Sequence, residues 1–133
     1  MPTVQQIQAL FEPFSRGDGP SFFNNVVDNV DWTVQGAHCK IAGHYKSKAE
    51  FHEGTRALSS TWAAPIKLVV QDVLLDGNKA AVELKAVDTT TKNGQPFPNV
   101  YVWIISLNDE GKIVKVRAYM DTDLVSRVIE QNS

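Results

Sequence analysis

The stretch NVYVWIISLNDEGKIVKVRAYMD, from Asn99 to Asp121, predicts a β-hairpin and decides the fold. Its two apolar runs flank the turn 108–111, Asn-Asp-Glu-Gly, whose residue types favour a reversal of the chain. Side chains alternate along a strand, so one face of the hairpin carries Asn99, Tyr101, Trp103, Val116, Ala118 and Met120. Polar and aromatic groups on an otherwise apolar inner face indicate a cavity that holds a small molecule.

Length, composition and charge limit the classes of protein to which the chain can belong. Its 133 residues fit a single domain, 1–133, and are enough to bury a core. The content of 43% hydrophobic and 21% charged residues is typical of a globular protein. A net charge of −2 without a Lys/Arg cluster argues against nucleic acid as a partner. A membrane partner is not expected either, because no apolar run approaches the roughly 20 residues that span a bilayer.

The N-terminal segment and the single cysteine predict a cytoplasmic protein. Residues 1–7 lack the basic start and the apolar stretch of a signal peptide. Cys39 has no partner for an internal disulfide, which fits a reducing compartment. A catalytic thiol is the alternative role for this side chain.

Two helices are predicted in the first 27 residues. Thr3 and Gln6 have the spacing of a capping box, and apolar residues follow at helical spacing: Ile7, Leu10, Phe11 and Phe14. A second helix is expected to start near Pro20, because proline favours the first helical position. Its apolar residues are Phe22, Phe23, Val26 and Val27.

A short strand, a loop and a third helix are predicted next. The strand covers 29–34, and the loop 36–45 contains two glycines and two histidines. Ser47 and Glu50 form a second capping pattern, so a helix is expected to begin there and to end before Pro65. Its buried side is expected to carry Phe51, Leu58 and Trp62.

The remaining sequence is predicted to be strands that end in a helix. Runs 66–75 and 79–90 meet across Asp76-Gly77-Asn78, a strong hairpin turn, and the hairpin at 99–121 precedes a helix over 122–130. Helices followed by meandering strands place the chain in the α+β class. We expect a strongly curved antiparallel sheet with the three N-terminal helices packed in its concave face.

Several short strings along the chain resemble one family. They are Ser15-Arg16-Gly17-Asp18, Val30-Asp31-Trp32-Thr33-Val34, Ala42-Gly43-His44-Tyr45, Asn99-Val100-Tyr101-Val102-Trp103, and Gly111-Lys112-Ile113-Val114 continuing to Arg117-Ala118-Tyr119. These strings are similar to those of SnoaL-like polyketide cyclases. That group lies within the nuclear-transport-factor-2-like superfamily, whose cystatin-like fold is also called ketosteroid-isomerase-like. The resemblance implies a cone-shaped sheet, no cofactor, and a homodimer formed through the outer sheet face.

The resemblance does not fix the reaction, because the superfamily includes isomerases, cyclases, dehydratases, epoxide hydrolases and non-catalytic proteins. Ketosteroid isomerases use a tyrosine, an aspartate base and a protonated aspartate. The corresponding positions here hold Leu10, Val34 (or, with a gap, Gln35) and Trp103. A steroid isomerase of that mechanism is therefore not expected.

An epoxide hydrolase is an alternative that the sequence matches only in part. That pattern needs an Arg/Asp pair on the third strand and a second aspartate on the last strand. Asp88 matches the first aspartate with a one-residue gap, but the arginine position holds Ala86 and the second aspartate position holds Ala118.

Asp88 is the first candidate for a catalytic acid or base. It ends the apolar face of its strand formed by Val82, Leu84 and Ala86, so alternation predicts that it reaches the cavity. Desolvation there would raise the pKa of the carboxyl toward values useful for proton transfer. The alternative is that Asp88 begins a loop and stays hydrated.

Histidines supply a second set of candidates, since imidazole titrates near neutral pH. His38 is expected near the cavity mouth and is the second catalytic candidate, whereas His44 and its neighbour Tyr45 are expected to contact substrate. His52 is expected on the outer side of the third helix. The histidines lack the spacing of metal ligands on one helix, so no metal site is predicted.

The inner face of the hairpin supplies the predicted substrate contacts. Tyr101, the third catalytic candidate, is placed to donate a hydrogen bond to a developing enolate oxygen, and Asn99 to orient a carbonyl. Trp103 and Trp32 are placed to stack on a flat substrate. Ala118 and Met120 complete the predicted wall; the alternative for the aromatic residues is an ordinary core.

Asp121 is a further acidic candidate, but its position favours a structural role. It alternates away from Ala118 and Met120 and precedes Thr122, where a helix N-cap belongs. We therefore expect Asp121 to cap the last helix.

Three hypotheses follow from the sequence. The first is a cofactor-free enzyme that shifts a proton or closes a ring in a small apolar, carbonyl-containing, polyketide-like substrate, with Asp88 or His38 as the acid/base. The second is an epoxide hydrolase that uses water activated by Asp88. The third is a non-catalytic protein that binds an apolar ligand.

Overall fold

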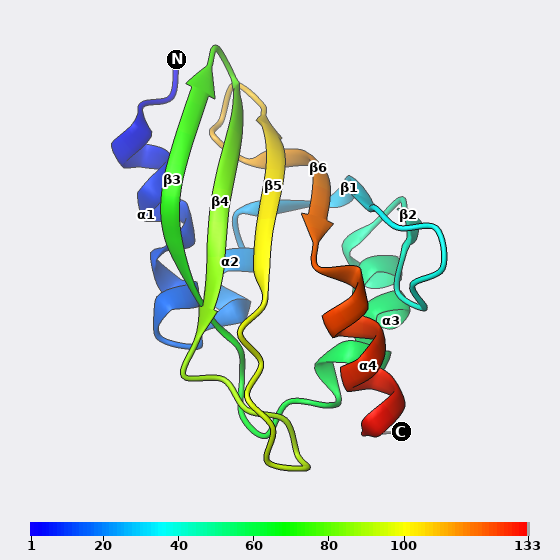
Figure 1. Cartoon of the computed structure of the whole chain (residues 1–133). Coiled ribbons are helices and arrows are strands. Elements are labelled where there is room, and N and C mark those ends of the chain that lie inside the picture. Colours follow the sequence, from blue (N-terminus) through cyan, green and yellow to red (C-terminus); the bar gives the residue numbers. More distant parts are fainter. Residues whose placement is uncertain (133) are drawn as a thin grey trace.

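One six-stranded sheet, in the order β2-β1-β6-β5-β4-β3, organises the part of the chain that the computed structural model describes, residues 1–132 (Figure 1). Four helices accompany it within these residues. The elements are α1 (Val4–Ser15), α2 (Gly19–Phe23), β1 (Val26–Val34), β2 (Gly43–Tyr45), α3 (Lys48–Ser59), β3 (Lys67–Asp76), β4 (Lys79–Val87), β5 (Val100–Leu107), β6 (Ile113–Met120) and α4 (Thr122–Gln131). The α+β class is confirmed.

The hairpin of β5 and β6 forms as its sequence predicts. Tyr101 pairs with Met120 and Trp103 with Ala118, and all four side chains lie on the concave side of the sheet. The Asn108 side chain accepts hydrogen bonds from the backbone N–H groups of 110 and 112, at 3.0 and 2.9 Å. These bonds close the turn and set the strand register.

The hairpin of β3 and β4 also forms, but β4 is shorter than predicted. Gly77 has a φ of 62° in the turn, which suits glycine. The strand was expected to continue to residue 90, yet it ends at Val87 because Asp88 adopts a φ of 44°. This left-handed residue breaks the alternation of side chains on which the prediction for Asp88 depended.

The first half of the sheet differs from the prediction in two ways. Val26 and Val27 belong to β1 rather than to the second helix, so this strand starts three residues earlier than expected. It pairs with β6 in parallel, which the sequence did not indicate, whereas the other neighbouring strands pair antiparallel as expected. The segment 43–45, expected to be a loop, is strand β2 along the other edge of β1.

The helix caps follow the predicted signals. Thr3 and Gln6 form a complete capping box at α1, and the Ser47 hydroxyl accepts from the backbone of Glu50 at α3. The Asp121 carboxylate accepts from the backbone N–H of Leu124 at 3.1 Å, which confirms that it caps α4.

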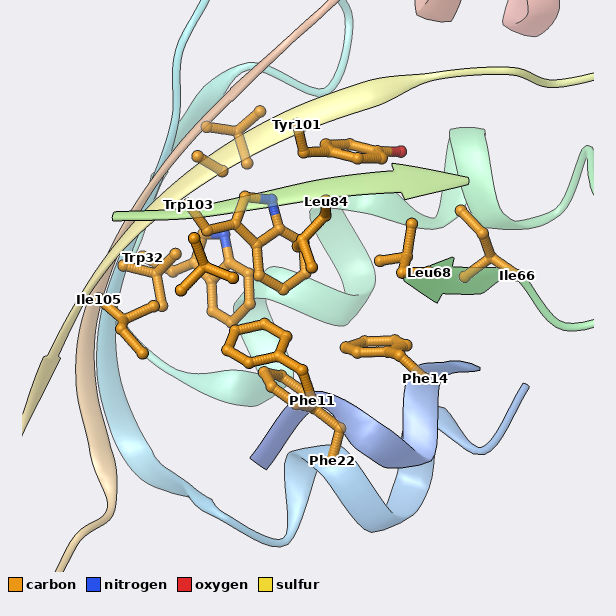
Figure 2. Packing of buried hydrophobic residues seen from close by; sticks show 14 of the residues in the cluster. Phe11, Phe14, Phe22, Trp32, Ile66, Leu68, Leu84, Tyr101, Trp103 and Ile105 are labelled. Atoms are coloured by element: carbon orange, nitrogen blue, oxygen red, sulfur yellow. The ribbon is translucent and has the colours of Figure 1, made fainter. Parts of the chain in front are cut away.

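An aromatic cluster joins the helices to the concave face of the sheet (Figure 2). Phe11 and Phe14 of α1 and Phe22 of α2 lie against Trp103, with ring centroids 5.9 to 6.0 Å apart. The rings of Trp103 and Trp32 are nearly perpendicular, with their centroids 5.2 Å apart. Helix α1 packs against β3, whereas α3 packs against β1 and β2.

Gly54 in α3 is required by the close approach of Tyr45. A Cβ at this position would overlap Cε1 of the Tyr45 ring and stand 2.6 Å from its Cζ. The ring cannot move easily, because its hydroxyl donates to the Ile41 carbonyl at 2.6 Å. We expect Gly54→Ala to lower the free energy of unfolding by about 1–3 kcal/mol, measured by urea denaturation, although alanine favours a helix.

The matched control for Gly54→Ala is the same change in a Tyr45→Ala background. There the overlap is gone, so the substitution should stabilise the protein by the helix-propensity difference of about 1 kcal/mol. Equal effects in both backgrounds would contradict the steric explanation.

Candidate functional site

A cavity of about 730 Å³ lies between the concave face of the sheet and the helices. The sheet contributes its floor, and α3 with the loop 62–66 contributes the opposite wall. The turn 17–20 between α1 and α2 completes the lining. This volume is in the range of sites that enclose a small organic molecule.

Five of the residues predicted to contact substrate line this cavity. Alternation along the strands directs them to the concave face, where they meet the helices. They are Trp32, Tyr101, Trp103, Ala118 and Met120. Figure 2 shows the Tyr101 hydroxyl pointing away from the Trp32–Trp103 pair, toward the side on which Ile66 lies.

Asn99 and Tyr45 lie behind the wall rather than in it. Asn99 is fully buried, and its Oδ1 accepts from the backbone N–H of Val100 at 3.0 Å. Its amide nitrogen, Nδ2, is buried and has no hydrogen-bond partner among residues 1–132. Tyr45 is half-buried and packs on Phe51. The expectation that either side chain contacts ligand directly is not met by this geometry.

The predicted position of Asp88 is wrong. Its side chain is exposed and outside the cavity lining. The left-handed backbone at this residue turns the next side chain inward instead: Thr89 is buried, accepts from the Lys67 N–H and donates to the Val87 carbonyl. Asp88 thus corresponds to the alternative interpretation, a hydrated residue at the start of a loop.

The predicted positions of His38 and His44 are also wrong. His38 is exposed on the loop after β1 and does not reach the cavity. His44 lies on β2, where its Nε2 is 2.7 Å from an Asp31 carboxylate oxygen, and both side chains are about half exposed. Edge strand β2 therefore directs this imidazole to the outer surface.

His52 was expected on the outer side of α3, and its side chain is indeed exposed, but it also belongs to the lining of the cavity. It lines the cavity with its ring 4.5 Å from that of Phe23 and 5.5 Å from that of Phe51. Partial burial lowers the pKa of the imidazole, and the positive charge of Lys48 lowers it further. The imidazole is therefore neutral at pH 7. The sequence does not separate this position from an ordinary exposed one, because His52, Thr55 and Ser59 form a polar stripe of α3 that is typical of a solvent-facing side.

Burial keeps the Tyr101 hydroxyl protonated. Desolvation raises its pKa far above the usual value, and the neighbouring Asn99 amide offsets only part of this effect. A neutral phenol held at a cavity wall is a hydrogen-bond donor at all physiological pH values.

The side chains of the lining carry no permanent charge in the described part of the chain. The indole nitrogens of Trp32, Trp62 and Trp103 have no acceptor in the described part of the chain and are covered by neighbouring side chains. Among residues 1–132, the lining contains no carboxylate, lysine or arginine side chain. This cavity is suited to an uncharged, mainly apolar molecule.

Residues 1–132 contain neither a metal-binding cluster nor a membrane-spanning helix. No group of three or more His, Cys, Asp or Glu side chains is arranged to hold a metal ion. None of the helices in this range is both long and apolar enough to cross a membrane.

Many solved structures have the same fold as this chain. An NTF2-like protein of unknown function from Burkholderia pseudomallei K96243 is 20% identical, with a TM-score of 0.74 over 94% of this chain and 95% of its own. PrhC from Penicillium brasilianum NBRC 6234 is 13% identical, with a TM-score of 0.78 over 96% and 85%. TerC, co-crystallised with polyporic acid, is 16% identical, with a TM-score of 0.65 over 96% and 97%. At these identities the likeness shows the fold alone.

A family model gives the more specific result. No curated protein matches the chain. The model of the SnoaL-like domain matches residues 7–116, which run from within α1 to the first half of β6. The chain therefore belongs to the SnoaL-like domain family.

Proposed function

We propose that the protein is a cofactor-free enzyme that moves a proton or closes a ring in an uncharged, apolar, carbonyl-containing substrate of polyketide type. The observation that carries this proposal is the aromatic-walled cavity with the neutral Tyr101 hydroxyl in its lining. Enolisation and ring closure both build negative charge on a carbonyl oxygen, and a positioned donor stabilises that charge.

The walls of the cavity support a flat substrate. The rings of Trp32 and Trp103 meet edge to face with their centroids 5.2 Å apart, and the centroid of the Phe51 ring lies 4.1 Å from that of Trp32. Aromatic faces at this density favour ring-containing molecules. TerC, a structural neighbour of the same fold, was crystallised with polyporic acid, which is consistent with small-molecule binding in this architecture.

A non-catalytic binding protein for an apolar ligand is the second candidate. The lack of a carboxylate side chain in the described lining favours it. The epoxide hydrolase hypothesis has no such support, because Asp88, the residue that would activate water, lies outside the lining.

Hydrogen exchange on a ring ketone separates the two candidates. β-Tetralone is incubated with the protein in deuterium oxide, binding is followed by tryptophan fluorescence, and deuterium incorporation by mass spectrometry. The proposed enzyme is expected to bind the ketone and to accelerate exchange over buffer. Binding without exchange would contradict the catalytic proposal and favour the binding protein, whereas no binding would contradict both.

The outer face of the sheet is proposed to form a homodimer. Three large apolar side chains on this face are exposed to solvent: Leu74 is 66% exposed, Val100 54% and Tyr119 43%. Apolar groups at this exposure on one sheet face are typical of an interface. Light scattering of the wild type is expected to give twice the chain mass of 14.7 kDa.

Charges placed on this face should separate the two copies. The double substitution Val100→Lys, Tyr119→Lys is expected to give the mass of one chain, because burying two lysines in an apolar contact is unfavourable. Lys92→Glu, a charge change in the exposed loop before β5, is the control and should leave the dimer intact. A wild type that runs as a single chain would contradict the proposal.

A further inference from the structure

His52 differs from the other two histidines because it lines the cavity and its ring nitrogens have no polar partner among the residues that the structure describes. His52 lines the cavity and, within residues 1–132, makes ring contacts with Phe23 and Phe51 but no hydrogen bond or ion pair. His44 is bound to Asp31 on the outer surface, and His38 lies on an exposed loop. In the described chain, His52 and Tyr101 are the ionisable side chains of the lining.

The charged groups around His52 are already paired with one another. Lys48, one turn earlier on α3, is 3.3 Å from Asp28 of β1 and donates to the Phe23 carbonyl at 3.0 Å. Arg56, one turn later, is 2.7 Å from Glu53. From α2, the imidazole faces the aromatic ring of Phe23. Within residues 1–132, no carboxylate is paired with the imidazole, and neither of its nitrogens has a hydrogen-bond partner.

We infer that His52 is the general acid/base of the proposed reaction. This inference rests on the proposed function and adds the group that the lining otherwise lacks, one that accepts and returns a proton. Tyr101 cannot fill this role, because it stays protonated and serves as a donor. Positioned histidines are the most frequent groups in such catalysis.

The step balances without any co-reactant. The neutral imidazole nitrogen of His52 takes a proton from the carbon next to the substrate carbonyl. The C–H electron pair becomes the carbon–carbon π bond of an enolate, and the carbonyl π pair moves to the oxygen, which accepts a hydrogen bond from Tyr101. Where a C=C bond adjoins the deprotonated carbon, the product of this step is a dienolate. The imidazolium returns its proton to the far carbon of that C=C bond, the double bond moves next to the carbonyl carbon, and the electron pair on the oxygen re-forms the C=O π bond, which completes an isomerisation.

Ring closure uses the same two groups. The enolate carbon attacks a second carbonyl of the same substrate and forms the new carbon–carbon bond. The π pair of that carbonyl becomes an alkoxide, which takes the proton from the His52 imidazolium. Substrate and product have the same composition in both cases, so neither reaction needs an oxidant or a reductant.

His52→Gln tests the inference with β-tetralone in deuterium oxide. Glutamine keeps a polar side chain of similar length but cannot carry the proton, so exchange should fall by about 10²–10⁴-fold. Ketone affinity should change little, since the aromatic wall remains. Glu53→Gln is the matched control: it removes an ionisable group one residue away that is exposed and outside the lining. It should exchange at the wild-type rate.

Two readouts distinguish proton transfer from a structural role. Exchange by the wild type should fall at acidic pH as the imidazole becomes protonated. The midpoint should lie below the usual histidine value of 6.5, because burial and Lys48 lower this pKa. His52→Gln should lose that pH dependence. Added imidazole should restore part of the exchange to His52→Gly, a variant that leaves space for it at the cavity wall.

The outcomes separate this inference from the function on which it rests. Failure of the wild type to bind or exchange the ketone would overturn the proposed function. Wild-type exchange that persists at the same rate and pH profile in His52→Gln would overturn the role of His52 alone. Thermal unfolding of each variant shows that the comparison is made on folded protein.

Discussion

Trp103→Ala is expected to lower the free energy of unfolding by about 3–5 kcal/mol and to abolish binding of an apolar ligand. The indole is 6% exposed and lies at the centre of the aromatic cluster. Its ring centroid is within 6.0 Å of five others: Phe11, Phe14, Phe22, Trp32 and Tyr101. Removal of the indole therefore takes away the aromatic contact between α1, α2 and the centre of the sheet, and it enlarges the cavity at the same time.

Urea denaturation and ketone titration measure the two parts of this effect. Domains of this size have only about 5–15 kcal/mol of stability, so a loss of about 3–5 kcal/mol can unfold the protein. Trp103→Phe is therefore measured alongside, because it keeps an aromatic ring in the cavity wall and costs less stability. Trp62→Ala is the matched truncation, since this half-buried indole in the loop after α3 has one ring neighbour, Phe97, at 5.9 Å. A loss at Trp103 no larger than that at Trp62 would show that the cluster does not depend on the central indole.

The fold could be predicted where local signals and side-chain alternation agree. The hairpin at 99–121 combines a turn with two uninterrupted strands, so its register and its inward residues follow directly from the sequence. The caps at Thr3, Ser47 and Asp121 are equally local. The parallel pairing of β1 with β6 could not be found in this way, because partners 84 positions apart, such as Thr33 and Arg117, leave no local signal.

The candidate site was predicted where it lies on regular strands and missed where the backbone departs from regularity. Trp32, Tyr101 and Trp103 obey alternation. Asp88 does not, because a single left-handed residue at the end of β4 reverses the direction of its side chain. His52 is expected on the outer side of α3, and its side chain is exposed, yet it also contributes to the cavity lining. The side of α3 that lines the cavity is wide enough to include both Phe51 and His52.

Tyr101→Phe is expected to reduce ketone exchange by about 10²–10³-fold while leaving ketone binding nearly unchanged. The substitution removes one oxygen atom and keeps the ring, so contacts with Trp103 and Met120 are retained. The hydroxyl matters more as charge develops on the carbonyl oxygen than when the ketone is neutral, which is why the rate should fall more than the affinity. Separate measurement of exchange rate and fluorescence titration shows this difference.

The neighbouring amide offers a second variant that acts through the same hydroxyl. Asn99 lies behind Tyr101 and does not line the cavity, so Asn99→Leu should lower exchange less than Tyr101→Phe. Combined with Tyr101→Phe it should add little, because groups that act on one interaction are not independent. If Asn99→Leu were fully additive with Tyr101→Phe, the two residues would act separately. If Tyr101→Phe exchanged at the wild-type rate, the donor that stabilises the enolate would not be this hydroxyl, and the catalytic proposal would lose its principal support.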